Sequence, residues 1–190
     1  MKRFLPILAM MLLGCAGSTN SQRPAPLPKT AVLEAPQRVP EPTRITHESW
    51  SIELPAGWKY NDAPQVDGDS TRLLEAKSLK KVGRSPITLA IDSSGFNGPD
   101  FFFGEAAAVL IQRVAEDNGE RVLNQRRVTL NGHPATLTIM VSQRAIVTGV
   151  IALGVNGTGY LVSCGGDALG EYGKIVSQTC TQVMSTFKAK

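Results

Sequence analysis

Thiol and imidazole groups are the side chains here that could most readily do chemistry. The chain of 190 residues has three cysteines, Cys15, Cys164 and Cys180, and two histidines, His47 and His133. A cysteine activated by a histidine is a nucleophile for acyl transfer, and Cys164 with His133 is one such combination. A disulfide between Cys164 and Cys180 would remove that nucleophile. The fate of each cysteine therefore decides whether a catalytic group exists.

Cys15 follows a segment with the layout of an export signal. Met1-Lys2-Arg3 is a short basic start, and an apolar run extends from Phe4 to Leu13. That run is shorter than the roughly 20 residues that a membrane-spanning helix needs. Leu12-Leu13-Gly14-Cys15 resembles the lipobox of bacterial lipoproteins, where cleavage before the cysteine leaves it as a lipidated N-terminus. The resemblance implies a signal peptide over residues 1–14 and a lipid anchor on Cys15.

A lipid on Cys15 would hold the rest of the chain in the cell envelope. Several acyl chains together are enough for stable membrane attachment. In bacteria with two membranes, Ala16 after the cysteine is similar to the pattern that favours sorting to the outer membrane. The alternative is an ordinary signal peptide with a chance cysteine.

A proline-rich stretch follows the anchor. Residues 15–46 are rich in Pro, Ser, Thr and Gln and show no apolar period, which is typical of a disordered tether. A proline-rich recognition segment is the alternative. We expect a single globular domain over residues 47–190.

Cys164 and Cys180 are predicted to form a disulfide. Lipid on Cys15 leaves an even pair in an exported protein, where disulfides persist. Tyr160, Val162 and Cys164 alternate onto one strand face, and Cys180 lies on the apolar stripe of the last helix. Two buried free thiols are the alternative. Two cysteines without a nearby histidine cannot complete a zinc site, so we expect no metal.

The hydrophobic patterning predicts an α+β domain: an antiparallel sheet of about six or seven strands flanked by two main helices. Asn131-Gly132 and Asn156-Gly157 indicate two hairpins. Phe102, Ala106, Val109, Leu110 and Val114 recur at helical spacing after a plausible N-cap, Asp100. The expected strands are Trp50–Leu54, Thr71–Leu79, Pro86–Ile91, Arg121–Leu130, Ala135–Ser142, Ala145–Gly154 and Tyr160–Cys164, and the closing helix is Leu169–Phe187.

Three short segments resemble a known group of proteins. They are Trp50-Ser51-Ile52-Glu53-Leu54-Pro55-Ala56-Gly57-Trp58, Leu130-Asn131-Gly132-His133-Pro134-Ala135 and Ser185-Thr186-Phe187. They are similar to the PsbP-like (MOG-type) α/β/α sandwich, and the resemblance covers residues 48–188. It implies a fold, and it carries over no catalytic residues because members of the group share no chemistry.

Charge argues for no particular polyanionic partner. The net charge is +4, and without Lys2 and Arg3 it is +2, from 18 basic and 16 acidic residues. We therefore expect no nucleic-acid partner. Basic residues cluster in two places, where we expect solvated strand edges, with a surface for anionic lipid or glycan as the alternative. The clusters are Arg72, Lys77, Lys80, Lys81 and Arg84, and Arg121, Arg126 and Arg127.

Phe101, Phe102 and Phe103 are three adjacent rings, of which one helix face can bury only part. We expect them to pack in the core and a covering loop, or else to line a ligand groove. Neither a nucleophile elbow nor a P-loop occurs, so we expect no enzyme and no cofactor. The expected function is a non-catalytic binding or assembly module with an envelope protein partner. The alternative is a carrier of a small apolar ligand or lipid, held in a cavity between sheet and helices.

Overall fold

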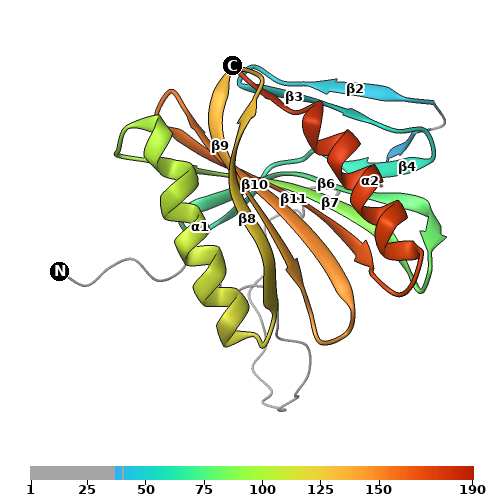
Figure 1. Cartoon of the computed structure of the whole chain (residues 1–190). Coiled ribbons are helices and arrows are strands. Elements are labelled where there is room, and N and C mark those ends of the chain that lie inside the picture. The colour runs from blue at the N-terminus through green and yellow to red at the C-terminus, as the bar shows by residue number, and fades with distance from the viewer. Residues whose placement is uncertain (1–36, 40) are drawn as a thin grey trace, which may run out of the picture.

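A large antiparallel sheet with one helix on each face forms most of the molecule (Figure 1). The computed structural model describes residues 37–39 and 41–190, with side chains from residue 41 onward, so the predicted signal peptide and Cys15 lie outside the described residues. The strand order is β1-β4-β6-β7-β11-β10-β9-β8, with β5 paired to β6. The strands are β1 (Gln37–Val39), β4 (Trp58–Asn61), β5 (Gln65–Asp67), β6 (Ser70–Val82), β7 (Ser85–Gly95), β8 (Arg121–Leu130), β9 (His133–Val141), β10 (Ile146–Val155) and β11 (Thr158–Asp167).

A second sheet of three strands, in the order β12-β3-β2, packs over one end of α2. It consists of β2 (Thr43–Thr46), β3 (Trp50–Leu54) and β12 (Lys188–Ala189). The prediction of six or seven strands was too low, and it placed Trp50–Leu54 in the main sheet. Strands of two to four residues are too short for the alternation of apolar residues to reveal them.

The domain begins earlier than predicted. β1 and β2 both lie inside the segment assigned to the tether, and Ile45 of β2 is 5% exposed in the main core. Each of these strands pairs with a partner from the globular domain, β1 with β4 and β2 with β3. Main-chain pairing therefore orders residues whose local sequence, between prolines, contains little apolar surface.

The β8–β9 and β10–β11 hairpins were predicted from their turn residues and are present. Asn131 and Gly132 have φ of 49° and 90°, and Asn156 and Gly157 have φ of 53° and 74°. Both central residues of a type I′ turn need a positive φ, which Asn and Gly tolerate best. The glycine-rich run from Gly154 to Gly159 is thus a hairpin turn.

The helices α1 (Asp100–Asp117) and α2 (Tyr172–Ser185) cover opposite faces of the main sheet. Neighbouring residues of β10 show this, because Val150 packs in the cluster with α1 and Ile151 in the cluster with α2. α1 contacts mainly β9 and β10, and α2 contacts mainly β11. Each helix covers only part of its face, so the fold contains more sheet than a balanced sandwich.

Glycines in β10 and β11 let α1 approach the sheet closely. A Cβ added at Gly154 would lie 2.5 Å from the carbonyl oxygen of Asp100, and one at Gly159 would lie 2.0 Å from the ring of Phe103. On the helix side, a Cβ at Gly104 would lie 3.0 Å from the carbonyl oxygen of Ala152. The contact between α1 and the sheet therefore depends on small residues in both elements.

Replacing Gly154 by alanine is expected to lower the free energy of unfolding by about 2 kcal/mol, because the added methyl group meets the backbone of α1. Urea unfolding of the full chain measures the change. Gly95→Ala is the matched control, since a Cβ there meets nothing within 4 Å. Equal midpoints for the two variants would show that α1 can shift without loss.

Candidate interaction surface

The predicted disulfide is present, and it joins β11 of the main sheet to α2, the helix that packs on it. The sulfur atoms of Cys164 on β11 and Cys180 on α2 lie 2.09 Å apart, and the two Cα atoms 5.4 Å apart. Both residues are buried. Because its sulfur is bonded to Cys180, Cys164 cannot be the nucleophile of a pair with His133.

The most exposed apolar surface of a helix lies on α1. Its outer face presents Phe101, Phe102, Val109 and Leu110, which are 56%, 49%, 63% and 44% exposed. Ala106 is exposed beside them. A single large apolar side chain that is exposed to solvent on a helix is ordinary. A contiguous group of such side chains marks an interaction site. We call Phe101, Phe102, Ala106, Val109 and Leu110 the α1 outer face.

α1 has two apolar faces, and it buries the one with the smaller residues. The buried residues are Phe103, Gly104, Ala107, Ala108, Ile111 and Ala115. The stripe that predicted the helix, from Phe102 to Leu110, is instead mostly exposed. The reason is the close approach to the sheet described above, which the glycine and the three alanines of the buried face allow. Phe103 and Ile111 are the two large side chains on that face, and most of the larger apolar side chains of the helix point outward.

The three adjacent phenylalanines separate accordingly. Phe103 is 9% exposed and packs edge-on against Phe96, with ring centroids 5.1 Å apart. The rings of Phe101 and Phe102 contact each other instead, with centroids 4.3 Å apart. Only one of the three thus packs in the core, and Phe101 and Phe102 are not covered by a loop within residues 41–190.

The first residue of α1 ties the helix to the β10–β11 turn. The Asp100 carboxylate accepts hydrogen bonds from the backbone N–H groups of Asn156 (2.7 Å) and Gly157 (3.0 Å). Asp100 was predicted to be the N-cap, and this was wrong. Pro99 occupies that position and forms no side-chain capping bond. The turn anchors the end of α1 next to Phe101 and Phe102.

Asp167 is the described carboxylate with the most strongly lowered pKa, and its bonds are structural. It is fully buried at the end of β11. Its oxygens accept hydrogen bonds from Arg84 Nε (2.9 Å), from the Arg84 backbone N–H (2.8 Å) and from the Leu169 backbone N–H (3.0 Å). Hydrogen bonding from the Arg84 side chain, and then from both backbone groups, lowers the pKa of Asp167 to about 2. Because these donors occupy both of its oxygens, the Asp167 carboxylate has a structural role: it joins the β6–β7 turn to the end of β11.

The predicted basic clusters are partly neutralised within the domain. Arg72 pairs with Asp92, Arg84 with Asp167 and Arg127 with Glu105. Burial raises the pKa of Asp92, and the hydrogen bond from Arg72 acts in the opposite direction. Arg121, Arg126 and Arg127 lie on β8, which is an edge strand of the main sheet. The predicted strand edge is therefore confirmed for this cluster, and charged side chains at an edge oppose pairing with another sheet. It is wrong for the first cluster, because β6, which carries most of it, lies between β4 and β7.

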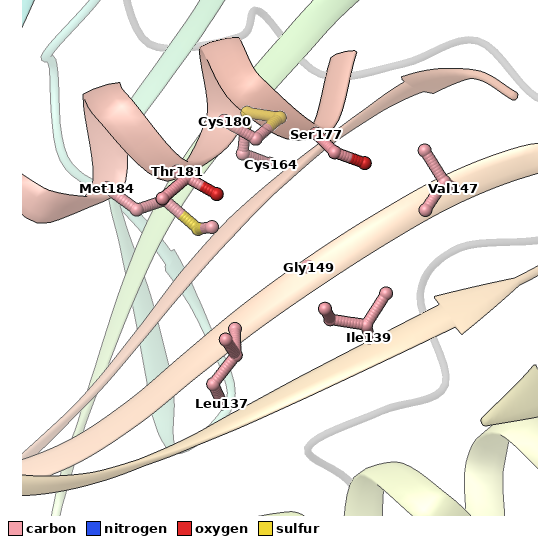
Figure 2. Close-up of a pocket in the computed structure, with 9 residues that line it drawn as sticks. All are labelled: Leu137, Ile139, Val147, Gly149, Cys164, Ser177, Cys180, Thr181 and Met184. Carbon is pink, nitrogen blue, oxygen red and sulfur yellow. A yellow bond between two sulfur atoms is a disulfide. The ribbon is translucent and has the colours of Figure 1, made fainter. Parts of the chain in front are cut away.

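A small pocket lies between α2 and the sheet, on the face opposite α1 (Figure 2). Leu137, Ile139 and Val147 point toward α2, and the Cys164–Cys180 disulfide forms part of the wall. Its volume is about 40 Å³, whereas pockets for small molecules measure roughly 300–1,000 Å³. The predicted carrier needs a cavity of that larger size, with the three phenylalanines at its mouth. None of the three lines this pocket.

A larger hollow, of about 380 Å³, adjoins the pocket and is open to solvent. All the residues that line it belong to the exposed side of α2: Ser177, Gln178, Thr181 and Gln182. Because no second element encloses it, a ligand there would stay largely in water. Ligand sites normally bury most of the ligand surface. The α1 outer face therefore remains the better candidate site.

Within residues 37–39 and 41–190, neither helix combines the length and the apolar character that crossing a bilayer requires. No group of three or more His, Cys, Asp and Glu side chains within these residues could hold a metal ion.

The fold matches that of a solved protein. Cyanobacterial PsbP (CyanoP) from Synechocystis sp. PCC 6803 superposes with a TM-score of 0.61 over 87% of this chain and 100% of its own, at 10% sequence identity. This chain has a PsbP-like fold. At that identity the likeness extends to the fold alone. No protein-family model and no curated protein sequence matches the chain.

Two other solved structures show a weaker similarity to the PsbP-like domain. A Bacteroides thetaiotaomicron protein has a TM-score of 0.40 and 14% identity, over 74% of this chain and 45% of that one. A Pseudomonas aeruginosa protein of unknown function has a TM-score of 0.44 and 14% identity, over 79% and 98%.

Proposed function

We propose that the chain is a non-catalytic binding or assembly module of the cell envelope, held there by lipid on Cys15, and that the α1 outer face is its contact surface. The observation that supports this most is the exposure of Phe101, Phe102, Val109 and Leu110 on a helix whose other face is already packed. Aromatic anchors of this kind contribute most of the binding energy in protein interfaces.

The position of the surface suits a binding module. α1 is fixed to the sheet along its inner face, and its first residue is bonded to the β10–β11 turn. The exposed rings therefore sit on a rigid element, so little conformational entropy is lost when a partner binds. The predicted tether would allow the domain to reach a partner at some distance from the membrane.

Crosslinking in intact bacteria tests the proposal. A photoreactive amino acid in place of Phe102 in the full chain should form a discrete covalent product with an envelope protein. Adding Val109→Ser should reduce that product about tenfold, because an apolar anchor is lost. Ile175→Ser is the matched control, since Ile175 is exposed on α2 to a similar degree, at 45%. No product from position 102, or an equal loss in both variants, would overturn the proposed contact surface.

A further inference from the structure

We propose that an exposed lysine surface on β4 and β6 binds the anionic lipid headgroups of the bilayer to which the chain is anchored. The β6 lysine surface consists of Lys59, Lys77, Leu79, Lys80 and Lys81. This inference rests on the proposed function, because it needs the lipid on Cys15 to bring the surface to a bilayer. It is carried by unpaired charges, by their register in the sheet and by the place where the chain enters the domain.

The lysines of this surface have no carboxylate partner within residues 41–190. The arginines of the same sequence cluster differ, because Arg72 and Arg84 both form ion pairs with aspartates. Protection of a sheet edge does not explain the lysines, since β6 lies between β4 and β7. β4 and β6 together contain one acidic residue, Glu75, so basic charge dominates there. The four ammonium groups are therefore available to an anion outside the domain.

The register of the strands sets two of these lysines directly against each other. Lys59 on β4 is the partner of Lys77 on β6. Their neighbours Trp58 and Ala76 are buried in the core with α2, so both lysines project from the other face of the sheet. Side chains in this relation lie roughly 5 Å apart at Cβ, where two like charges destabilise a sheet. An anion bound between them would remove that repulsion.

A bulge in β6 adds an apolar side chain to this group of charges. The register of β6 against β7 shifts between Lys77 and Lys81, so β6 has extra residues there. Leu79 lies in this stretch and is 41% exposed. Its backbone N–H donates to the carbonyl oxygen of Gly57 (2.7 Å), which holds the bulge in place. An apolar side chain among lysines is the combination with which peripheral proteins contact an anionic bilayer.

The place where the chain enters the domain favours a bilayer as the source of the anion. β1 is the first described strand, and it pairs with β4, the strand that contains Lys59. Gln37 of β1 is 22 residues beyond Cys15 (37 minus 15), a length of chain that spans at most about 80 Å. The lipid would therefore hold the lysines near headgroups at a high local concentration. Lysine suits this occupant, because a flexible point charge can follow mobile headgroup phosphates.

α1 has the opposite charge from the β6 lysine surface. It contains four acidic residues and one basic residue. β7 and β11 lie between β6 and β10, the strand that α1 contacts most (Figure 1), which separates the two surfaces by roughly 14 Å across the sheet. An anionic bilayer would attract one surface and repel the other. The contact would thus orient the domain and leave the α1 outer face accessible to a partner.

Fluorescence quenching in vesicles tests this contact. The full lipidated chain with Thr88→Cys is labelled with a fluorophore, since Thr88 is exposed and lies opposite Lys77. Lipids that carry a quencher should quench this label in vesicles of phosphatidylethanolamine and phosphatidylglycerol. They should not do so in phosphatidylcholine vesicles, and about 1 M salt should abolish the effect. Gln178→Cys, exposed on α2, is the matched control and should show no quenching.

Removal of two lysines gives a second measurement. Lys77→Gln/Lys81→Gln should weaken the contact about 25-fold, because each lysine near an anionic surface favours contact about fivefold. Lys174→Gln/Lys188→Gln removes the same charge elsewhere and should have little effect. Equal quenching at positions 88 and 178, equal quenching in the two kinds of vesicle, or equal effects of the two double variants would overturn the proposal.

The same vesicles separate a failure of this inference from a failure of the proposed function. A chain that stays with both kinds of vesicle but shows no quenching at position 88 would keep its anchor, and only the lysine surface would lose its partner. Retention of that chain on an anionic polysaccharide would then assign the lysines to a glycan. A chain that stays with neither kind of vesicle, and whose Cys15 takes up the fluorophore, would overturn the anchor and the lysine contact together.

Discussion

Replacing Cys164 and Cys180 together by alanine is expected to lower the free energy of unfolding by about 3 kcal/mol. The bridge closes a loop with a sequence separation of 16 residues, and without it the unfolded chain gains the entropy of that loop. The effect is large for this domain because the bond joins α2 to β11, and α2 also packs against the second sheet. A free energy change of this size is a large part of the total stability of a typical domain.

Urea unfolding of the full chain, with and without a reducing agent, measures this effect. Without the reducing agent the double variant should unfold at a clearly lower urea concentration than the unmodified chain. With it, the two curves should nearly coincide, because both chains then lack the bond. Equal midpoints under oxidising conditions would show that packing alone holds α2 in place.

Replacing Asp167 by asparagine is expected to lower the Tm at neutral pH by roughly 6–12 °C. The substitution keeps the size of the side chain but removes the charge that accepts the bonds from Arg84 and the Leu169 backbone. An amide offers one oxygen in place of two, so at least one buried donor loses its partner.

The difference between the two proteins should depend on pH in one direction. The folded pKa of Asp167 is about 2, below its ordinary value of 3.8, so the ionised group stabilises the folded state. That stabilisation is fully present above about pH 4 and is lost as the pH falls through about 2. Thermal unfolding at about pH 7, 4 and 2.5 should therefore show the Asp167→Asn difference shrinking toward acid. Asp69→Asn, at an exposed turn position, is the control, and a pH-independent difference would contradict the assigned cause.

The two stabilising features lie away from the α1 outer face. The disulfide is on the opposite side of the sheet, and Asp167 lies at the end of β11 beside the β6–β7 turn. Variants at these sites should therefore change stability without changing contacts made by Phe102 or Val109. This separation allows a loss of binding by α1 variants to be attributed to the surface itself.

Local sequence determined much of this PsbP-like domain. Asn131-Gly132 and Asn156-Gly157 specify their hairpins because both central positions of the turn need a positive φ. The alternation in β11 and the stripe in α2 placed Cys164 and Cys180 on facing surfaces, where the structure joins them. Each of these features depends on residues close together in the chain, and local rules suffice for it.

The tertiary structure decided what local rules could not. β1 and β2 are strands because β4 and β3 pair with them, and their own residues predict a tether. α1 offered two apolar faces, and its sequence favoured burial of the one with Phe102, Val109 and Leu110. The structure buries the other face. α1 packs close to the sheet at Gly154 and Gly159, and Gly104 and Ala107 on the helix leave room for that close contact. The candidate contact surface exists because close packing against a glycine-lined sheet is met mainly by small residues, with Phe103 and Ile111 as the large exceptions, and leaves most of the large apolar residues outside.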